Sequence, residues 1–485
     1  MSSAVGDLSQ ARISTVRRLL EQAPDTAVQS LEAFLDGEPG AEAPSDAVLD
    51  LIAAERDDRR LRNAVFAPLA PVFASRAGGL MRLRLSADLP ILLWRAMKAQ
   101  GPDRLAQAAT AFAEAQAAGS AQSAAQSAAQ SAAQSAAQSA VRTSAQSSPR
   151  SGLDSEAGAI LETLTRIAAL GLVDRVDAYG EIVARFETRP DELSTLILLL
   201  KLTPLLRLAV ASLPAWMTAR AGEYDLAIKD LVAAASVEDE QAPPLLMEAL
   251  LGDLERPAHI LRLISVVMDR PTDRLFALCE YASFGERLLD HVDAQIEIIR
   301  AFEPRRGLEG GVAVASAATT AHVTLSEFEQ NLILAKEGVW GTRIAAQRRS
   351  LALAMEMRLR EVEGAVSSAL PALSARLGGK VVRGSADLGR PPEQRAIDRA
   401  VGLIALVEGC RPSAASAGYG AIRLKVLETL DGWLESYTQD LLERLHKGGP
   451  GADRMRAYLD IAAEFTAMVR GPEAAALIRR RVAAA

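Results

Sequence analysis

Residues 275–299 have the sequence LFALCEYASFGERLLDHVDAQIEII, in which apolar or small side chains recur in steps of three and four. The positions on this stripe are Leu275, Leu278, Ala282, Gly285, Leu289, Val292, Ile296 and Ile299. Such spacing lines one side of an α-helix and is typical of a coiled-coil seam about three heptads long. The segment therefore predicts one long amphipathic helix that packs on another helix, in the same chain or in a second one.

Three more stripes of this kind follow toward the C-terminus. They run through Leu351, Met355, Leu359, Val362, Val366 and Ala369, through Val426, Leu430, Trp433, Tyr437, Leu441 and Leu445, and through Met455, Tyr458, Ala462, Phe465 and Val469. Glycine and proline interrupt the pattern between the stripes. We therefore expect residues 325–485 to form an antiparallel helical bundle, with 378–392 as its longest loop.

The composition of the whole chain favours helices over sheets. Its 485 residues are 49% hydrophobic but only 4% aromatic, so alanine, leucine, valine and isoleucine must form the core. Alanine and leucine lose little side-chain entropy in a helix, whereas strands favour β-branched and aromatic residues. The expected fold class is all-α: a multi-helix body with an antiparallel helical bundle, a small N-terminal helical unit and a low-complexity linker.

A repeated Ser-Ala-Ala-Gln tract, at about 119–140, divides the chain. Its period of four drifts around a helix that turns every 3.6 residues or so, and the tract therefore presents no lasting apolar face. We expect a flexible Ala/Ser/Gln-rich linker at 114–157, after an acidic helical domain at 1–113. A middle helical domain at 158–305, a Gly/Ala loop at 306–324 and the bundle at 325–485 complete the predicted organisation.

The charge of the chain bears on its partners. A net charge of −7 argues against a general affinity for nucleic acid, which depends on Lys and Arg that neutralise phosphates. Lysine supplies only 7 of the 54 basic residues, which together with abundant alanine indicates GC-rich codon usage. We expect a bacterial source.

Cysteine usage and hydropathy bear on the compartment. Cys279 and Cys410 lie far apart and form no CxxC pair, which fits a reducing cytoplasm. The most apolar stretch, 193–214, is interrupted by Lys201, Pro204 and Arg207. A membrane span needs about 20 apolar residues with few charges. We therefore expect a buried helix here, or two short ones meeting near Pro204, and no membrane span.

Enzymatic chemistry has few candidates among the titratable side chains. The four histidines are His259, His291, His322 and His446. They do not form the clusters with carboxylates that zinc and di-iron sites use, so we predict no catalytic residue, no metal ligand and no cofactor. The seam places His291 opposite the buried face, exposed between Asp290 and Asp293. A helical phosphotransfer module or small-molecule enzyme that uses His291 or His259 therefore stays as an alternative.

An arginine-rich helix is the remaining candidate interaction surface. Arg348, Arg349, Arg358 and Arg360 lie in the helix expected over 344–373. Glu356 and Glu363 share its polar face. Because the charges are mixed, this face is either an ordinary solvated surface or a phosphate-binding stripe. A third possibility, a nucleic-acid-associated regulator, requires one coherent basic surface. That surface would consist of Arg343, Arg349, Arg376, Lys380 and Arg383.

The functional expectation follows mainly from what the chain lacks. Helical bodies without clustered polar catalytic groups usually serve binding. The sequence therefore predicts a non-enzymatic adaptor or scaffold, which presents helical surfaces to a protein partner or to a second copy of itself.

Overall fold

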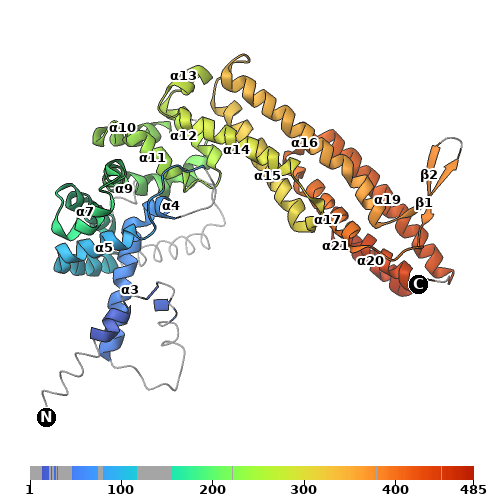
Figure 1. The fold of residues 1–485 in the computed structure, drawn as a ribbon, viewed down its shortest axis with the longest axis horizontal. Helices are drawn as coiled ribbons and strands as arrows, with labels where there is room; N and C mark the ends of the chain where they lie inside the picture. The colour runs from blue at the N-terminus through green and yellow to red at the C-terminus, as the bar shows by residue number, and fades with distance from the viewer. Residues whose placement is uncertain are drawn as a thin grey trace, which may run out of the picture. The chain divides into compact units, whose positions relative to one another are not determined.

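The computed structural model describes residues 14–20, 23–24, 27–28, 30, 46–74, 80–116, 156–220, 222–377, 380–448 and 451–485 (Figure 1). The chain divides into two compact units, Met1–Glu255 and Arg256–Ala485. Both consist of helices packed on helices, so the predicted all-α class is confirmed. The strands in the described residues are the two of one short hairpin in the second unit.

The first unit is built around one long helix. Its main elements are α3 (Asp46–Phe66), η1 (Ala67–Leu69), α4 (Ala70–Phe73), α5 (Leu89–Gln100), α7 (Glu156–Val173), α8 (Gly180–Arg185), α9 (Pro190–Thr218), α10 (Asp225–Glu238) and α11 (Ala242–Leu251). Helix α9 contacts η1, α7, α10 and α11, while α7 also contacts α3 and α5. Helices on both sides of the expected linker therefore share one core.

Helix α9 contains the apolar stretch that the sequence singles out. It is one helix with Pro204 and Pro214 inside it, not two short ones. Arg207, the charge in its middle, donates to the carbonyl oxygens of Ala64 and Val65 in the last turn of α3, at 2.9 and 3.2 Å. A cation at a helix C-terminus satisfies carbonyls that have no partner within their own helix. Arg207 thus joins α9 to the C-terminal end of α3.

Within the described part of the chain, α9 is the one helix whose length and composition would allow it to cross a membrane. The mean hydropathy of its most apolar stretch is 1.9, and 50% of that stretch is buried inside the unit. A core helix of a folded protein passes the same test, and the contacts of α9 with its neighbours are those of such a helix.

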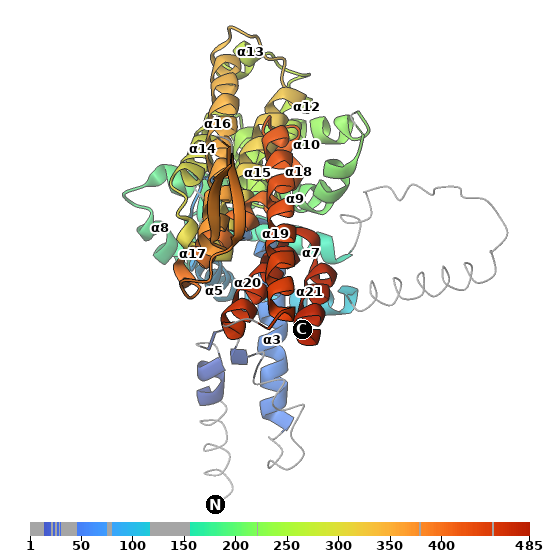
Figure 2. The same cartoon turned by 90° about the vertical axis from the view of Figure 1, so that its right-hand side faces the viewer.

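The second unit contains the longest helices. Its elements are η4 (Pro257–His259), α12 (Ile260–Val267), α13 (Asp273–Leu278), α14 (Ala282–Arg300), η5 (Pro304–Arg306), α15 (Gly307–Asn331), α16 (Val339–Ala369), β1 (Ala372–Leu377), β2 (Lys380–Ala386), α17 (Gln394–Gly409), α18 (Arg411–Ala414), α19 (Gly420–His446), α20 (Ala452–Arg470) and α21 (Pro472–Ala484). Helix α17 is central, since it contacts α15, α16 and α20. Helices α19, α20 and α21 lie side by side near the C-terminus (Figure 2).

Glycine allows α15 and α17 to cross at very short range. A Cβ atom added to Gly311 would lie 2.1 Å from the carbonyl oxygen of Gly402 and 2.8 Å from the Cβ of Ala405. A Cβ added to Gly402 would lie 2.7 Å from the carbonyl oxygen of Pro304. The two backbones therefore approach more closely than any residue with a side chain would permit.

The predicted long helix over 275–299 is divided in the structure. Helix α13 ends at Leu278, Cys279 is extended, and α14 begins at Ala282. Leu275 and Leu278 are 60% and 78% exposed, whereas Phe276 is fully buried with its ring centroid 5.0 Å from that of Trp340. Burial of this aromatic side chain competes with the leucine stripe and turns α13 away from it.

The rest of the seam behaves as expected within this chain. Gly285, Leu289, Val292, Ile296 and Ile299 are all buried, and α14 packs on α15 and α16 of the same unit. The helix therefore has its packing partners inside its own chain.

Two expected loops contain regular structure, one throughout its described length and the other in its first half. The Gly/Ala loop predicted at 306–324 is wrong, because α15 runs through it and uses its small residues to approach α17. In the loop predicted at 378–392, β2 pairs with β1 as an antiparallel hairpin in which Leu377 lies opposite Lys380. Small residues mark close helix packing here rather than a break in the chain.

The predicted linker at 114–157 lies mostly outside the described residues, which include 114–116, still helical, and 156–157 at the start of α7. The domain boundaries predicted at 113, 157 and 305 stay predictions. The structure places the division into compact units between Glu255 and Arg256.

Candidate functional site: a groove between α16 and α19

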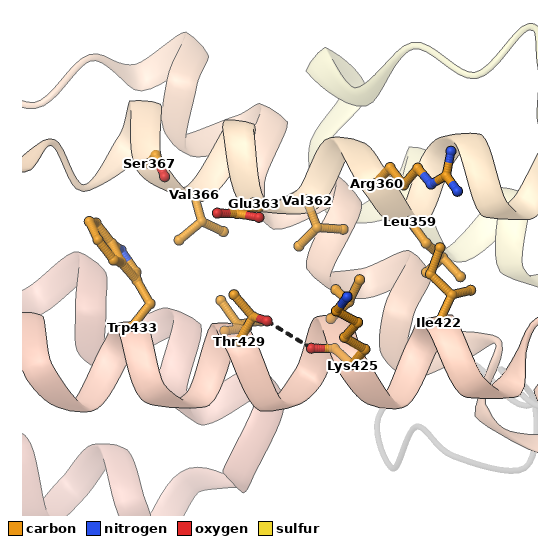
Figure 3. Close-up of a pocket in the computed structure, with 12 residues that line it drawn as sticks. Leu359, Arg360, Val362, Glu363, Val366, Ser367, Ile422, Lys425, Thr429 and Trp433 are labelled. Carbon is orange, nitrogen blue, oxygen red and sulfur yellow. Dashed lines mark hydrogen bonds between the residues drawn. The ribbon is translucent and has the colours of Figure 1, made fainter. Parts of the chain in front are cut away.

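A groove of about 270 Å³ lies between α16 and α19 in the second unit (Figure 3). Its apolar lining consists of Leu359, Val362 and Val366 from α16 with Ile422, Val426, Leu430 and Trp433 from α19. Its polar lining consists of Arg360, Glu363, Ser367, Lys425 and Thr429. An apolar trough with a few polar groups along its edges is the usual character of a binding site in a protein.

The two helices run in the same direction along the groove. Residue numbers increase from Leu359 to Ser367 and from Ile422 to Trp433 toward the same end in Figure 3. The expected bundle is therefore not antiparallel at this pair. The β1–β2 hairpin and α17 separate α16 from the later helices in sequence, which gives the chain the length it needs to return to its starting end.

The apolar stripes predicted from the sequence position the lining residues. On α16, the stripe from Leu351 to Ala369 is buried, and Leu359, Val362 and Val366 also line the groove. On α19, Tyr437 of the stripe packs on Tyr458 of α20, while the N-terminal part of the stripe lines the groove. The stripe on α19 thus serves two purposes along its length.

Trp433 is held at one end of the groove by an aromatic stack. Its ring lies 6.0 Å from that of Tyr437 with an interplanar angle of 29°, and Tyr437 in turn meets Tyr458 of α20 edge to face at 6.4 Å. Burial raises the pKa of the Tyr437 hydroxyl, so this side chain stays neutral. Aromatic pairs of this geometry contribute roughly 0.5–1.5 kcal/mol beyond their burial, which favours the observed orientation of the indole.

The two cations that line the groove differ, because Arg360 has a carboxylate partner and Lys425 has none within the described ranges. Arg360 is paired with Glu356 one turn earlier on α16. Lys425 is exposed, and its side chain extends from α19 toward α16 (Figure 3). In the described part of the chain, no carboxylate lies within 4.0 Å of the Lys425 ammonium. The groove therefore carries one cation that is available to a ligand.

The other arginines predicted as an interaction surface are placed differently. Arg348 pairs with Glu329 of α15 at 2.6 Å. Arg358 donates to the carbonyl oxygen of Ile299 at 3.1 Å and to Glu361 at 2.7 Å. Arg349 is exposed. Of the four predicted arginines, Arg360 is the one that lines the groove, and Arg348 and Arg358 join helices within the unit.

Two members of the basic surface needed by a nucleic-acid-associated regulator have described side chains: Arg349, which is exposed, and Arg343, which is paired with carboxylates. Arg343 donates to Glu286, Asp290 and Asp293 at 3.0, 2.6 and 2.8 Å. Burial acts to lower the pKa of the Arg343 guanidinium, but the hydrogen bonds and charges of Asp290 and Asp293 raise it overall. The side chains of Arg376, Lys380 and Arg383 lie outside the described part of the chain.

The predicted functional histidine is less accessible than its helical position indicates. His291 is half-buried, with its Nε2 atom 3.4 Å from the side-chain amide of Gln295, and burial lowers its pKa. Its sequence neighbours Asp290 and Asp293 bind Arg343. The packing of α16 on α14 thus encloses a face that the seam alone leaves exposed.

His259 lies elsewhere in the unit, with its Nε2 atom 3.8 Å from Glu327. Within the described residues, no three His, Cys, Asp or Glu side chains are grouped as metal ligands would be.

The structure also brings together His322 and Ser416, a polar pair that was not predicted from the sequence. His322 of α15 is 8% exposed, and its Nε2 atom lies 2.7 Å from the hydroxyl of exposed Ser416, which follows α18. Its Nδ1 atom is buried without a hydrogen-bond partner among the described residues. Burial, reinforced by the charge of Arg348, lowers the pKa of His322. The two residues are 94 positions apart, so only the fold reveals the pair.

We expect the free energy of unfolding to fall as the pH drops below about 6.5, the pKa of histidine in an unfolded chain. The folded-state pKa values of His322 and His291 are lowered, so the unfolded chain binds more protons and stability rises with pH. Each histidine contributes a slope of at most about 1.4 kcal/mol per pH unit. Urea unfolding at about pH 7.5 and about pH 5.5 measures it, and His322→Gln should reduce the difference. An unchanged difference in that variant would contradict the assignment.

Comparison with known proteins gives no relative for this chain. It matches no protein-family model, no curated protein and no solved structure. What supports a function is therefore the geometry of the groove itself.

Proposed function

We propose that this protein is a non-enzymatic helical adaptor, and that the groove between α16 and α19 binds a helical segment of a partner protein. The single observation that carries the proposal is the groove, with its apolar floor and its polar edges from two long helices (Figure 3). Grooves of this kind accept the apolar face of an amphipathic helix, whose anchors recur in steps of three and four.

The dimensions of the groove support a helical ligand. Its lining on α19 extends from Ile422 to Trp433, which at 1.5 Å per residue is about 17 Å, or three helical turns. Trp433 provides a large, rigid apolar surface at one end, and aromatic side chains of this type dominate binding energy at many protein interfaces.

A bulky side chain placed in the groove should weaken partner binding without unfolding the protein. Thr429 is exposed and lines the groove, whereas its neighbour Glu428 is exposed and does not. We expect Thr429→Trp to occupy the space that the ligand needs, with a loss of affinity of at least tenfold. Glu428→Trp adds the same side chain outside the groove and should leave binding unchanged.

The test is parallel capture of the tagged wild-type chain and both variants from native cells, with quantitative mass spectrometry of the bound proteins. A partner retained by the wild type and Glu428→Trp but lost from Thr429→Trp supports the proposal. Equal recovery from all three proteins contradicts it. Recovery of the chain itself, with a doubled mass in solution, identifies a second copy as the occupant and rejects the adaptor.

A further inference from the structure

The two walls of the groove have aligned helix dipoles. Because α16 and α19 run in the same direction, their partially positive N-terminal ends point one way and their partially negative C-terminal ends the other (Figure 3). A third helix that binds between them interacts more favourably with these dipoles when it runs antiparallel to both helices. Its own C-terminal end then lies toward the N-terminal sides of α16 and α19.

The charged side chains along the groove are also ordered, since its two cations lie toward one end and its carboxylate, Glu363, lies between them and Trp433. Arg360 and Lys425 lie toward the end marked by Leu359 and Ile422, and Trp433 lies at the opposite end (Figure 3). Cations favour the C-terminal turn of a helix, where carbonyl groups have no partner in their own helix. Lys425 can donate to these carbonyls or to a carboxylate in that turn.

We infer that the bound segment is an amphipathic helix about three turns long that lies antiparallel to α16 and α19, with an acidic C-terminal turn beside Lys425 and Arg360 and its N-terminal apolar anchor on Trp433. This inference rests on the proposed function and adds the chemistry and direction of the partner segment. An isolated helix of three turns is marginal in water, so the segment becomes helical as it binds.

The probe is a synthetic peptide of about 15 residues, with leucines in steps of three and four and glutamates in its last turn. A contact quencher is attached at its N-terminus or, in a second peptide, at its C-terminus. The chain has four tryptophans, and Trp433→Phe supplies the background emission of the other three. We expect the N-terminal quencher to reduce Trp433 emission and the C-terminal one to leave it almost unchanged.

Charge exchange tests the chemistry of the bound end. We expect Lys425→Glu to weaken binding of the acidic peptide about tenfold, the low end of the range for a hydrogen bond to a charged group. A peptide with lysines in its last turn should prefer this variant over the wild type. Lys447→Glu is the matched control, since Lys447 is exposed just beyond the end of α19 and outside the groove lining.

The outcomes separate the two proposals. Quenching from the C-terminus instead of the N-terminus overturns the antiparallel direction while leaving the groove as the binding site. Saturable binding that responds to Thr429→Trp but not to Lys425→Glu overturns the acidic end. Saturable binding that responds to neither variant, or no saturable binding to the wild-type chain, overturns the inference, and the capture experiment with Thr429→Trp decides the proposed function separately.

Discussion

Replacing Gly311 with alanine is expected to lower the free energy of unfolding of the second unit by about 3 kcal/mol, the upper part of the range for overpacked cores. The added Cβ would lie 2.1 Å from the carbonyl oxygen of Gly402. That atom belongs to the backbone of α17, so it cannot rotate away as a flexible side chain would. The collision is relieved only if α17 moves away from α15, and this movement would disturb the contacts that α17 makes with α16 and α20.

Gly364→Ala is the matched control for this prediction. Gly364 also lies inside a long helix, α16, but it is exposed and a Cβ there meets nothing within 4 Å. Alanine is a better helix former than glycine by roughly 0.5–1 kcal/mol, so this variant should be slightly more stable than the wild type. Urea unfolding of the full chain, followed by circular dichroism, measures both variants. Equal stabilisation by both substitutions would show that the close crossing does not exist.

Replacing Glu248 with alanine is expected to destabilise the first unit by about 2 kcal/mol, because it removes a charged acceptor from two backbone donors in partly buried hydrogen bonds. Glu248 of α11 is 9% exposed and accepts hydrogen bonds from the backbone amides of Arg82 and Leu83, at 2.6 and 3.4 Å. These amides lie in residues 80–86, which precede α5 and have no helix or strand. Without the carboxylate, this segment loses its attachment to a helix more than 160 residues away in sequence.

Glu248→Gln separates the hydrogen bond from the charge. The amide keeps an acceptor oxygen in the same place, so roughly half of the stability should return. Limited proteolysis measures the local stability of residues 80–88, where cleavage should be faster in Glu248→Ala than in the wild type. Unfolding curves that coincide for Glu248→Ala and the wild type would contradict the attachment.

Local pattern was sufficient to predict most helices and their buried faces. The stripe from Leu351 to Val366 is buried along α16, and that through Met455, Tyr458, Ala462 and Phe465 is buried along α20. Such stripes report which side of a helix avoids water, because their period matches that of the helix. They do not report which helix covers the face, nor in which direction it runs.

The predictions that failed depend on contacts between distant residues. Phe276 outweighs Leu275 and Leu278 because Trp340 lies across from it, more than 60 positions away. The glycines and alanines of α15 resemble a loop until α17 is placed against them. The groove itself arises only when α16 and α19 are side by side, and only Arg360 among its lining residues belongs to the surface predicted from sequence.

The crossing of α15 and α17 also limits how this protein can diverge. Every amino acid other than glycine carries a Cβ atom, so any missense change at Gly311 or Gly402 brings the same collision with a backbone carbonyl. Elsewhere in the core, valine, leucine and isoleucine can replace one another at modest cost because side chains repack. We therefore expect Gly311 and Gly402 to stay glycine in any homologue that keeps this crossing, while the apolar side chains packed around them can vary.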